Sequence, residues 1–267
     1  MIPVQDAADP RLADYVGLTD VRRRRLVEPE VDGTGIFIAE GEPVVRRALA
    51  AGFRIRSLLV DSKRYDALRG VVGDAPAYVA APDVLAAITG FNVHRGVLAS
   101  FARKAQPDLP TVLASARRLL VCENLTSTTN LGAVLRSAAA LGVDGVLLSP
   151  ECCDPLYRRA VRVSMGAALR LPTHRLSSWP ASLAAVRDAG FTVIALTPDP
   201  AAEPIDTVDL GGKAALLLGE EGPGLTDEAL AAADVRVRIP LADGVDSLNV
   251  AAAAAVACYV FGRSELA

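Results

Sequence analysis

An alternation of short aliphatic runs with helical segments in the second half of the chain constrains the fold most. The aliphatic runs predict buried strands at 118–122, 145–149, 191–196, 214–218 and 235–239. Apolar residues at helical spacing predict helices over 131–141, 155–164, 179–189, 226–233 and 247–262. Continuously apolar strands that alternate with helices are typical of a parallel sheet covered on both faces. We therefore predict an α/β domain.

A smaller α/β unit is predicted before this sheet. Its strands are expected at 35–40, 55–61 and 96–101, and its helices at 42–51 and 82–89. Residues 102–110 contain Pro107 and Pro110 and are typical of a linker. The sequence thus predicts two domains, 1–105 and 106–267, with a basic helix over 17–27 outside the compact part of the first.

Composition and charge narrow the classes of function. Only 4% of the residues are aromatic, which argues against an RNA-binding surface built on base stacking. Residues 1–105 hold 15 Lys and Arg against 13 Asp and Glu, a net charge of +2, and residues 106–267 hold 13 against 18, a net charge of −5. Because the whole chain carries −3, affinity for RNA phosphates would have to come from local basic clusters.

Several classes of site and location are not expected. The four cysteines form no Cys-x-x-Cys pair, so we expect reduced thiols and a cytoplasmic protein. With His94 and His174 as the only histidines, no metal site is expected. The first residues do not resemble a signal peptide, and the Ala-rich run at 250–261 is too short to span a membrane. Dinucleotide-binding, phosphate-loop and nucleophile-elbow motifs are absent.

Three polar or glycine-containing segments follow aliphatic runs of the predicted sheet. They are Asn130–Arg136 (NLGAVLR), Leu218–Leu225 (LGEEGPGL) and Ile239–Asn249 (IPLADGVDSLN). Such positions lie at strand ends, where α/β proteins bind ligands. Gly219, Gly222 and Gly224 would let the backbone approach a ligand closely, although a simple tight turn is an alternative. Thr226 is predicted to cap the helix that follows.

In order and content, these segments resemble the three motifs of the SpoU/TrmH class of RNA ribose 2′-O-methyltransferases in the SPOUT superfamily. A weaker resemblance, at 35–41 and 94–97, is to the substrate-binding domain that precedes the catalytic domain in many such enzymes. The resemblance implies a C-terminal deep trefoil knot, which topology rules alone would not predict. It also implies S-adenosyl-L-methionine as the cofactor, RNA as the substrate and a homodimer.

The resemblance further implies catalytic roles, first of all for Arg136. Neutralising an arginine, whose pKa is about 12.5–13.8, would cost on the order of 8 kcal/mol at pH 7. We therefore expect a charged clamp on phosphate or on the developing alkoxide rather than a base. Asn130 would hold Arg136 or the ribose, with a turn residue before the helix as the alternative. Glu220 would orient the acceptor or the arginine, but the adjacent Glu221 leaves open which of the two carboxylates acts, and an exposed pair without a role is the alternative. Ser247 and Asn249 complete the set, although Ser247 has an alternative role as a helix cap.

The remaining candidates fall into two sets. The cofactor-binding positions implied by the resemblance are Leu196, Thr197, Leu218, Gly219, Glu220, Gly224, Ile239, Leu241, Leu248 and Asn249. The RNA-binding candidates are Arg22, Arg23, Arg24, Arg25, His94, Arg95, Arg136, Arg158 and Arg162. For the run of four arginines, an exposed face without RNA contact is the alternative, and for His94 it is a structural role.

Together these features predict an S-adenosylmethionine-dependent RNA ribose 2′-O-methyltransferase. Ribosomal RNA is favoured as the substrate because simple transfer-RNA enzymes of this class often lack an N-terminal domain. The alternatives are a transfer-RNA 2′-O-methyltransferase, an RNA-binding protein of the same fold without catalytic activity, and, from the acidic net charge, a small-molecule α/β enzyme.

Overall fold

A computed structural model describes residues 1–18, 35–93, 96–208 and 211–263 of the chain. The chain divides into two compact units, one of Met1–Ala105 with Leu156–Leu169 and the other of Gln106–Pro155 with Arg170–Ala267. The segment Leu156–Leu169, which we predicted within the second domain, instead packs with the first unit, because Val161 and Leu169 are buried in that unit's core. The predicted basic helix over 17–27 lies almost entirely outside the described residues.

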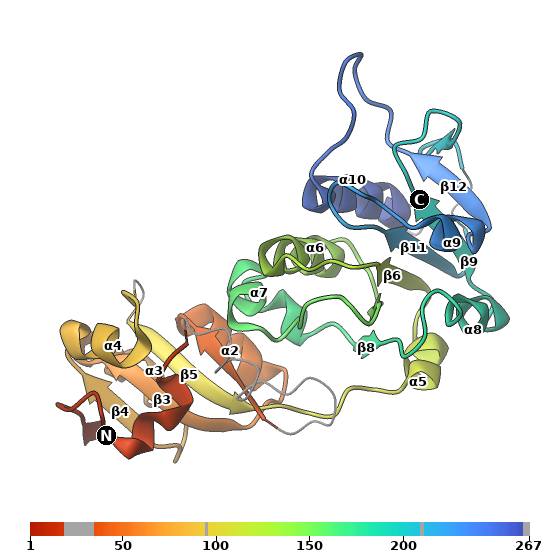
Figure 1. Cartoon of the computed structure of the whole chain (residues 1–267). Helices are drawn as coiled ribbons and strands as arrows, with labels where there is room; N and C mark the ends of the chain where they lie inside the picture. Colours follow the sequence, from red (N-terminus) through yellow and green to blue (C-terminus); the bar gives the residue numbers. More distant parts are fainter. Residues whose placement is uncertain (19–34, 94–95, 209–210, 264–267) are drawn as a thin grey trace. The chain divides into compact units, whose positions relative to one another are not determined.

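The first unit is built on a five-stranded mixed sheet (Figure 1). Its strands, in sheet order, are β1 (Ile2–Pro3), β4 (Ala77–Ala80), β3 (Ile55–Asp61), β5 (Val97–Ala102) and β2 (Ile36–Glu40). Strand β5 is antiparallel to both of its neighbours, and the other pairs are parallel. Its helices are α2 (Glu42–Ala50), α3 (Ser62–Leu68), α4 (Pro82–Thr89) and a 3-10 helix at Pro10–Tyr15, and the segment Leu156–Leu169 adds α7 (Arg158–Val163) and a 3-10 helix at Ala167–Leu169. The three predicted strands and two predicted helices are confirmed, as is the helix predicted over 155–164, and the other short elements were not predicted.

Both faces of this sheet carry buried side chains, which explains why its strands are mostly apolar. Phe37 and Ile38 are neighbours in β2 but pack into different clusters, as do Leu58 and Leu59 in β3. Successive side chains of a strand point to opposite faces, so each strand supplies two cores. One of these clusters contains Val161 from α7 (Arg158–Val163).

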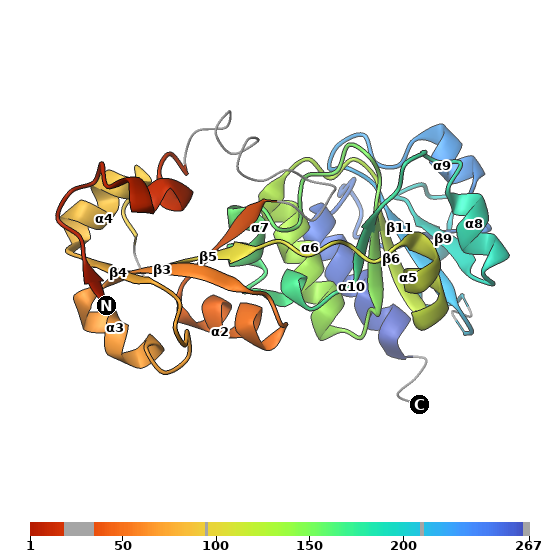
Figure 2. The ribbon, with the colours of Figure 1, turned by 90° about the horizontal axis from the view of Figure 1, so that it is seen from below.

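The second unit contains the predicted parallel sheet (Figure 2). Its strands are β6 (Arg118–Cys122), β7 (Gly145–Leu148), β8 (Thr173–Arg175), β9 (Thr192–Leu196), β10 (Glu203–Pro204), β11 (Ala214–Leu218) and β12 (Val235–Arg238). They pair in the order β10-β12-β9-β11-β6-β7-β8, and every pair is parallel. All five predicted strands are confirmed. Strands β8 and β10 were not predicted because three or two residues carry no periodicity.

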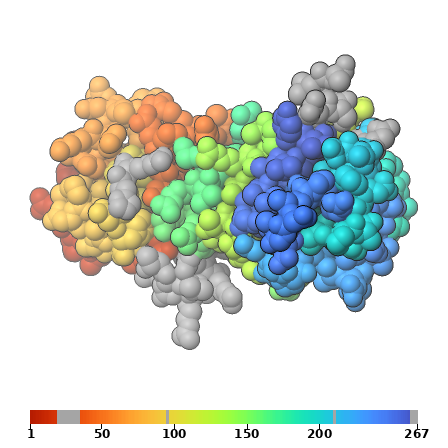
Figure 3. Space-filling model, turned by 90° about the horizontal axis from the view of Figure 1, so that it is seen from above, coloured from red at the N-terminus to blue at the C-terminus, as the bar shows by residue number. Residues whose placement is uncertain are grey.

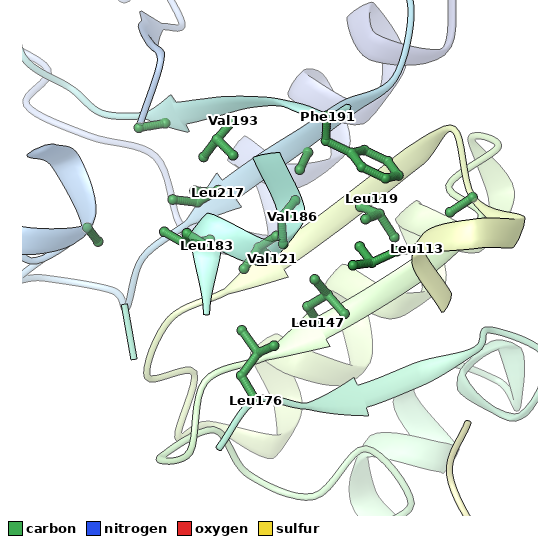
Figure 4. Close-up of a cluster of buried hydrophobic side chains, with 14 of the residues drawn as sticks. Leu113, Leu119, Val121, Leu147, Leu176, Leu183, Val186, Phe191, Val193 and Leu217 are labelled. Carbon is green, nitrogen blue, oxygen red and sulfur yellow. The ribbon is translucent and has the colours of Figure 1, made fainter. Parts of the chain in front are cut away.

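Helices cover both faces of this sheet. They are α5 (Leu109–Ser115), α6 (Thr128–Ala140), α8 (Leu183–Asp188), α9 (Asp227–Ala231) and α10 (Val250–Arg263). Leu113 of α5 and Leu183 of α8 pack with Val121, Val193 and other strand residues on one face (Figure 4). Helices α6 and α10 pack against each other on the opposite face (Figure 2). None of the described helices is long and apolar enough to cross a membrane.

Several helices of this unit begin after a side chain that caps them. Thr226 caps α9 as predicted, because its side chain accepts a hydrogen bond from the N–H of Ala229. The predicted cap of the last helix by Ser247 is wrong: α10 begins at Val250, and Asn249 Oδ1 accepts from the N–H of Ala251 at 2.9 Å. The predicted linker also ends early, because Asp108 caps α5 through the N–H of Thr111.

Candidate functional site

A cavity of about 330 Å³ opens at the carboxyl ends of β9, β11 and β12. It is lined by Leu196, Thr197, Pro198, Leu218, Gly219, Glu220, Glu221, Gly222, Gly224, Ile239, Leu241, Ser247, Leu248, Asn249, Val250 and Ala253. All ten residues that we predicted to bind the cofactor line this one cavity. On the surface, the cyan residues near position 200 lie beside blue residues of the last part of the chain (Figure 3).

The loop from Gly219 to Leu225, here called the motif-two loop, forms one wall. The N–H of Gly224 donates to the carbonyl of Glu220 at 2.9 Å, so the loop closes on itself. A Cβ atom on Gly219 would lie only 2.1 Å from the carbonyl carbon of Gly224. Gly222 and Gly224 have φ angles of 95° and 77°, which favour glycine. The tight turn that we considered as an alternative is therefore present, and it lines the cavity.

A polar network at the rim of the cavity joins all three motifs. Asn130 of α6 donates through Nδ2 to Glu221 Oε2 at 2.7 Å. Asn249 donates through Nδ2 to Glu221 Oε1 at 3.1 Å and approaches Asn130 Oδ1 at 3.4 Å. Asn249 thus caps α10 and binds the carboxylate of the motif-two loop with the same side chain.

Glu221, and not the predicted Glu220, is the acidic residue that connects the motifs. The carboxylate of Glu220 lines the cavity but accepts a hydrogen bond from Thr126 Oγ1 at 2.7 Å. The sequence alone gives no reason to prefer one of two adjacent glutamates for this contact, and only the course of the loop distinguishes them. The structure therefore favours Glu221 for the contact with the two asparagines, and a catalytic role of Glu220 stays a prediction.

Arg136 lies on the exposed side of α6. It lies six positions after Asn130 in the helix, which corresponds to about 240° of rotation and about 9 Å along the axis. The two side chains therefore leave the helix in different directions, and the hydrogen bonds of Asn130 go to Glu221 and Asn249 rather than to Arg136. Among the residues that the structure describes, none forms a hydrogen bond or ion pair with the Arg136 guanidinium, which is open to an anion.

Glu123, to which the sequence assigned no role, is a fully buried acidic residue directly after β6. Its carboxylate accepts hydrogen bonds from the N–H of Thr226 at 2.9 Å, from the Thr226 hydroxyl at 2.7 Å and from the indole N–H of Trp179. The sequence signal was an acidic residue immediately after an apolar strand. Periodicity alone could not show that the residue is buried.

The RNA-binding candidates have different outcomes. Arg22–Arg25, His94 and Arg95 lie outside the described residues. Arg158 pairs with the buried carboxylate of Glu40 at 2.6 Å and lies over the ring of Phe91 at 4.1 Å, so its guanidinium is engaged within the first unit. Arg162 reaches the same carboxylate at 3.5 Å and is more exposed. Contact of these arginines with RNA stays a prediction.

The cysteines are not part of the lining of this cavity. In the described ranges, no three His, Cys, Asp or Glu side chains converge as metal ligands would. The cysteines are free, and three of them are buried. Burial raises the pKa of Cys153, the partly exposed one, to about 12. This thiol is therefore a poor nucleophile at neutral pH.

Comparisons with known proteins agree with this geometry. The model of the SpoU rRNA Methylase family matches residues 117–259. A tRNA/rRNA methyltransferase of Mycobacterium tuberculosis, itself uncharacterised, is 46% identical over 270 residues, which cover 98% of this chain and 91% of that protein. RlmB of Haemophilus ducreyi, a 23S rRNA (guanosine-2′-O-)-methyltransferase, is 33% identical over 180 residues, 66% of this chain and 73% of that protein.

Solved structures extend the likeness to both units. The crystal structure of an AdoMet-bound rRNA methyltransferase from Sinorhizobium meliloti is 26% identical, with a TM-score of 0.82 over 99% of this chain and 98% of that one. The match of the family model covers more than half of the chain, and the Mycobacterium tuberculosis relative matches almost end to end. The chain belongs to the SpoU rRNA methylase family.

Proposed function

We propose that this protein transfers a methyl group from S-adenosylmethionine to a ribose 2′-hydroxyl of RNA, with ribosomal RNA as the substrate. The observation that carries the proposal is the network in which Glu221 joins Asn130 and Asn249 at the rim of the cavity. Residues of all three motifs meet there although more than a hundred positions separate the first from the last. The likeness to a 23S rRNA 2′-O-methyltransferase supports both the ribose acceptor and the ribosomal substrate.

The cavity fits S-adenosylmethionine, which supplies an electrophilic methyl group. Its volume of about 330 Å³ lies in the range of small-molecule sites. Leu196, Leu218 and Ile239 offer apolar walls for a nucleobase. Gly219 lets the motif-two loop fold back tightly, because a Cβ there would meet the backbone of Gly224 and Leu225, and backbone N–H and C=O groups are left along the wall of the cavity.

Glu221 holds the side-chain amides of Asn130 and Asn249 in place. Each of its oxygens accepts a hydrogen bond from a different asparagine, so both oxygens are committed to positioning Asn130 and Asn249. The amide groups would then hold the ribose in line with the methyl group. Orientation of this kind accounts for a large part of catalysis in bimolecular transfers.

Arg136 acts in its charged form in this scheme. It holds an RNA phosphate or the oxygen that loses its proton, because deprotonating an arginine at pH 7 is too costly for it to serve as a base. A hydroxyl that attacks a sulfonium methyl becomes acidic as the new bond forms. The proton therefore leaves late and needs only a weak acceptor.

Three features of the family complete the proposal. We propose a trefoil knot, supported by the return of α10 to pack on α6 after β12 has paired with β9. We propose a homodimer, supported by the exposed Val256 and Tyr259 on α10, and RNA recruitment by the first unit. A cytoplasmic location stays a prediction. A crystal structure would test the knot and the dimer together, and an unknotted, monomeric chain would contradict both.

Transfer of a labelled methyl group tests the proposed function. Purified protein, tritiated S-adenosylmethionine and RNA from cells lacking the protein should give labelled ribosomal RNA and little labelled transfer RNA. Arg136→Ala should lose transfer and keep cofactor binding. The matched control is Arg187→Ala, on α8 across the sheet from α6, which should retain transfer.

The outcomes separate the alternatives. Turnover by Arg136→Ala at the wild-type rate would contradict the role of the arginine. Labelled transfer RNA alone would favour the transfer-RNA enzyme. Cofactor binding without transfer to any RNA would favour an RNA-binding relative without catalytic activity.

A further inference from the structure

Glu123 holds both ends of the motif-two loop. Its backbone N–H donates to the carbonyl of Leu218, the last residue before the loop, at 2.8 Å. Its carboxylate accepts from the N–H and the hydroxyl of Thr226, the first residue after the loop, at 2.9 and 2.7 Å. One buried residue thus fixes the entrance and the exit of a loop that forms a wall of the cavity.

The contact with Thr226 extends to the next element. Thr226 caps α9 by accepting from the N–H of Ala229 while its own hydroxyl donates to Glu123. Among the described residues, the third partner of the Glu123 carboxylate is the indole N–H of Trp179, and all three of these groups are donors. An ionised carboxylate, which only accepts hydrogen bonds, matches these donors. An amide does not match them, because its NH₂ group is itself a donor.

We propose that Glu123 is a positioning residue that sets the shape of the cofactor cavity by fixing the motif-two loop. The inference rests on the proposed function, because it assumes that S-adenosylmethionine binds in this cavity. Glu123 does not line the cavity itself and acts through Thr226. It differs from Glu221, whose carboxylate lies at the rim and contacts the asparagines.

Glu123→Gln tests this role with little change of shape. The amide oxygen can replace the carboxylate oxygen that accepts two bonds, but the amide NH₂ then faces the N–H of Thr226, donor against donor. We expect the Kd for S-adenosylmethionine to rise at least tenfold and the KM for RNA to stay within twofold. Thr226→Val should weaken cofactor binding in the same direction, and the double variant should lose less than the product of the two effects.

Asp144→Asn is the matched control. The Asp144 carboxylate accepts from the backbone N–H groups of Arg117 and Arg118, both at 2.8 Å, at the opposite end of β6. Changing Asp144 to Asn likewise replaces a carboxylate by an amide and weakens a contact with the backbone of β6, but at the end of the strand away from the cavity. We expect a comparable loss of thermal stability with cofactor affinity within twofold of the wild type.

Calorimetric titration with S-adenosylmethionine, below the unfolding temperature of every variant, provides the measurement. The inference is overturned if Glu123→Gln binds as tightly as the wild type, or if Asp144→Asn loses as much affinity. If Glu123→Gln does not fold, Thr226→Val decides in the same assay, and wild-type affinity in that variant would refute the role. A wild-type protein that binds no S-adenosylmethionine would overturn the cofactor site itself, which is a distinguishable failure.

Discussion

Gly219→Ala is the substitution whose effect follows most directly from the structure. The new Cβ would lie 2.1 Å from the carbonyl carbon of Gly224 and 2.3 Å from the backbone nitrogen of Leu225. Carbon atoms in contact are normally about 3.5–4.0 Å apart. The loop would therefore have to open by more than 1 Å, and the atoms that must move are backbone atoms, which cannot rotate away as a side chain would.

The size of the effect can be worked from this overlap. Inserting a carbon into a packed site costs about 1–3 kcal/mol, and a backbone clash belongs at the upper end of that range. Replacing glycine by alanine recovers about 0.4–1 kcal/mol from the unfolded chain. The net loss of about 2 kcal/mol should lower the thermal unfolding midpoint of the second unit by about 4–8 °C, because 1 kcal/mol corresponds to about 2–4 °C for a unit of about 150 residues.

Activity should fall further than stability. A displacement of about 1 Å at a reacting site can cost about 100-fold in rate. Differential scanning calorimetry and cofactor titration would measure both effects. The control is Gly70→Ala, where a Cβ meets no atom within 4 Å. A Gly219→Ala variant with wild-type midpoint and cofactor affinity would refute the packing argument for the motif-two loop.

Three further predictions use other parts of the molecule. Glu221→Gln should lower the transfer rate about tenfold or more, since hydrogen bonds to a charged acceptor contribute about 1.5–3 kcal/mol. Glu220→Gln should transfer methyl groups at nearly the wild-type rate. A larger loss in Glu220→Gln than in Glu221→Gln would contradict the network. Arg158→Ala should lower the free energy of unfolding of the first unit, measured by urea denaturation, by about 3 kcal/mol, because the Glu40 carboxylate stays buried and loses its main partner. An unchanged free energy of unfolding would refute the importance of this buried ion pair. Iodoacetamide should label native Cys153 slowly at pH 8, since burial raises its pKa from 9.0 to about 12. Because the Cys153 thiol ionises more easily in the unfolded chain, its contribution to the free energy of unfolding is fully present below about pH 9 and falls as the pH rises towards 12.

The main elements of the fold could be predicted because they are long and apolar. Strands such as β6 and β11 are five residues long and buried throughout, which leaves few alternatives. Strand β10 has two residues, and only its pairing with β12 defines it. The grouping of Leu156–Leu169 with the first unit depends on packing at a distance, so local sequence could not reveal it.

The site could be predicted in outline and not in its contacts. The glycines marked the wall of the cavity because a Cβ on Gly219 would clash with the backbone of Gly224, and because Gly222 and Gly224 have positive φ angles that favour glycine. The choice between Glu220 and Glu221 depended on which way each side chain leaves a tight loop, and neither spacing nor composition records that direction. Asn249 replaced Ser247 as the cap of α10 for a similar reason: both are good capping residues, and the helix begins one residue after the second.

Nucleoside mass spectrometry of RNA methylated by this protein tests the central claim most directly. With S-adenosylmethionine carrying a deuterated methyl group, ribosomal RNA from cells lacking the protein should yield one deuterated nucleoside with the added mass on the ribose. Fragmentation separates the base from the sugar and locates the label. A label on the base would leave the cofactor assignment standing and contradict the proposed ribose 2′-O transfer.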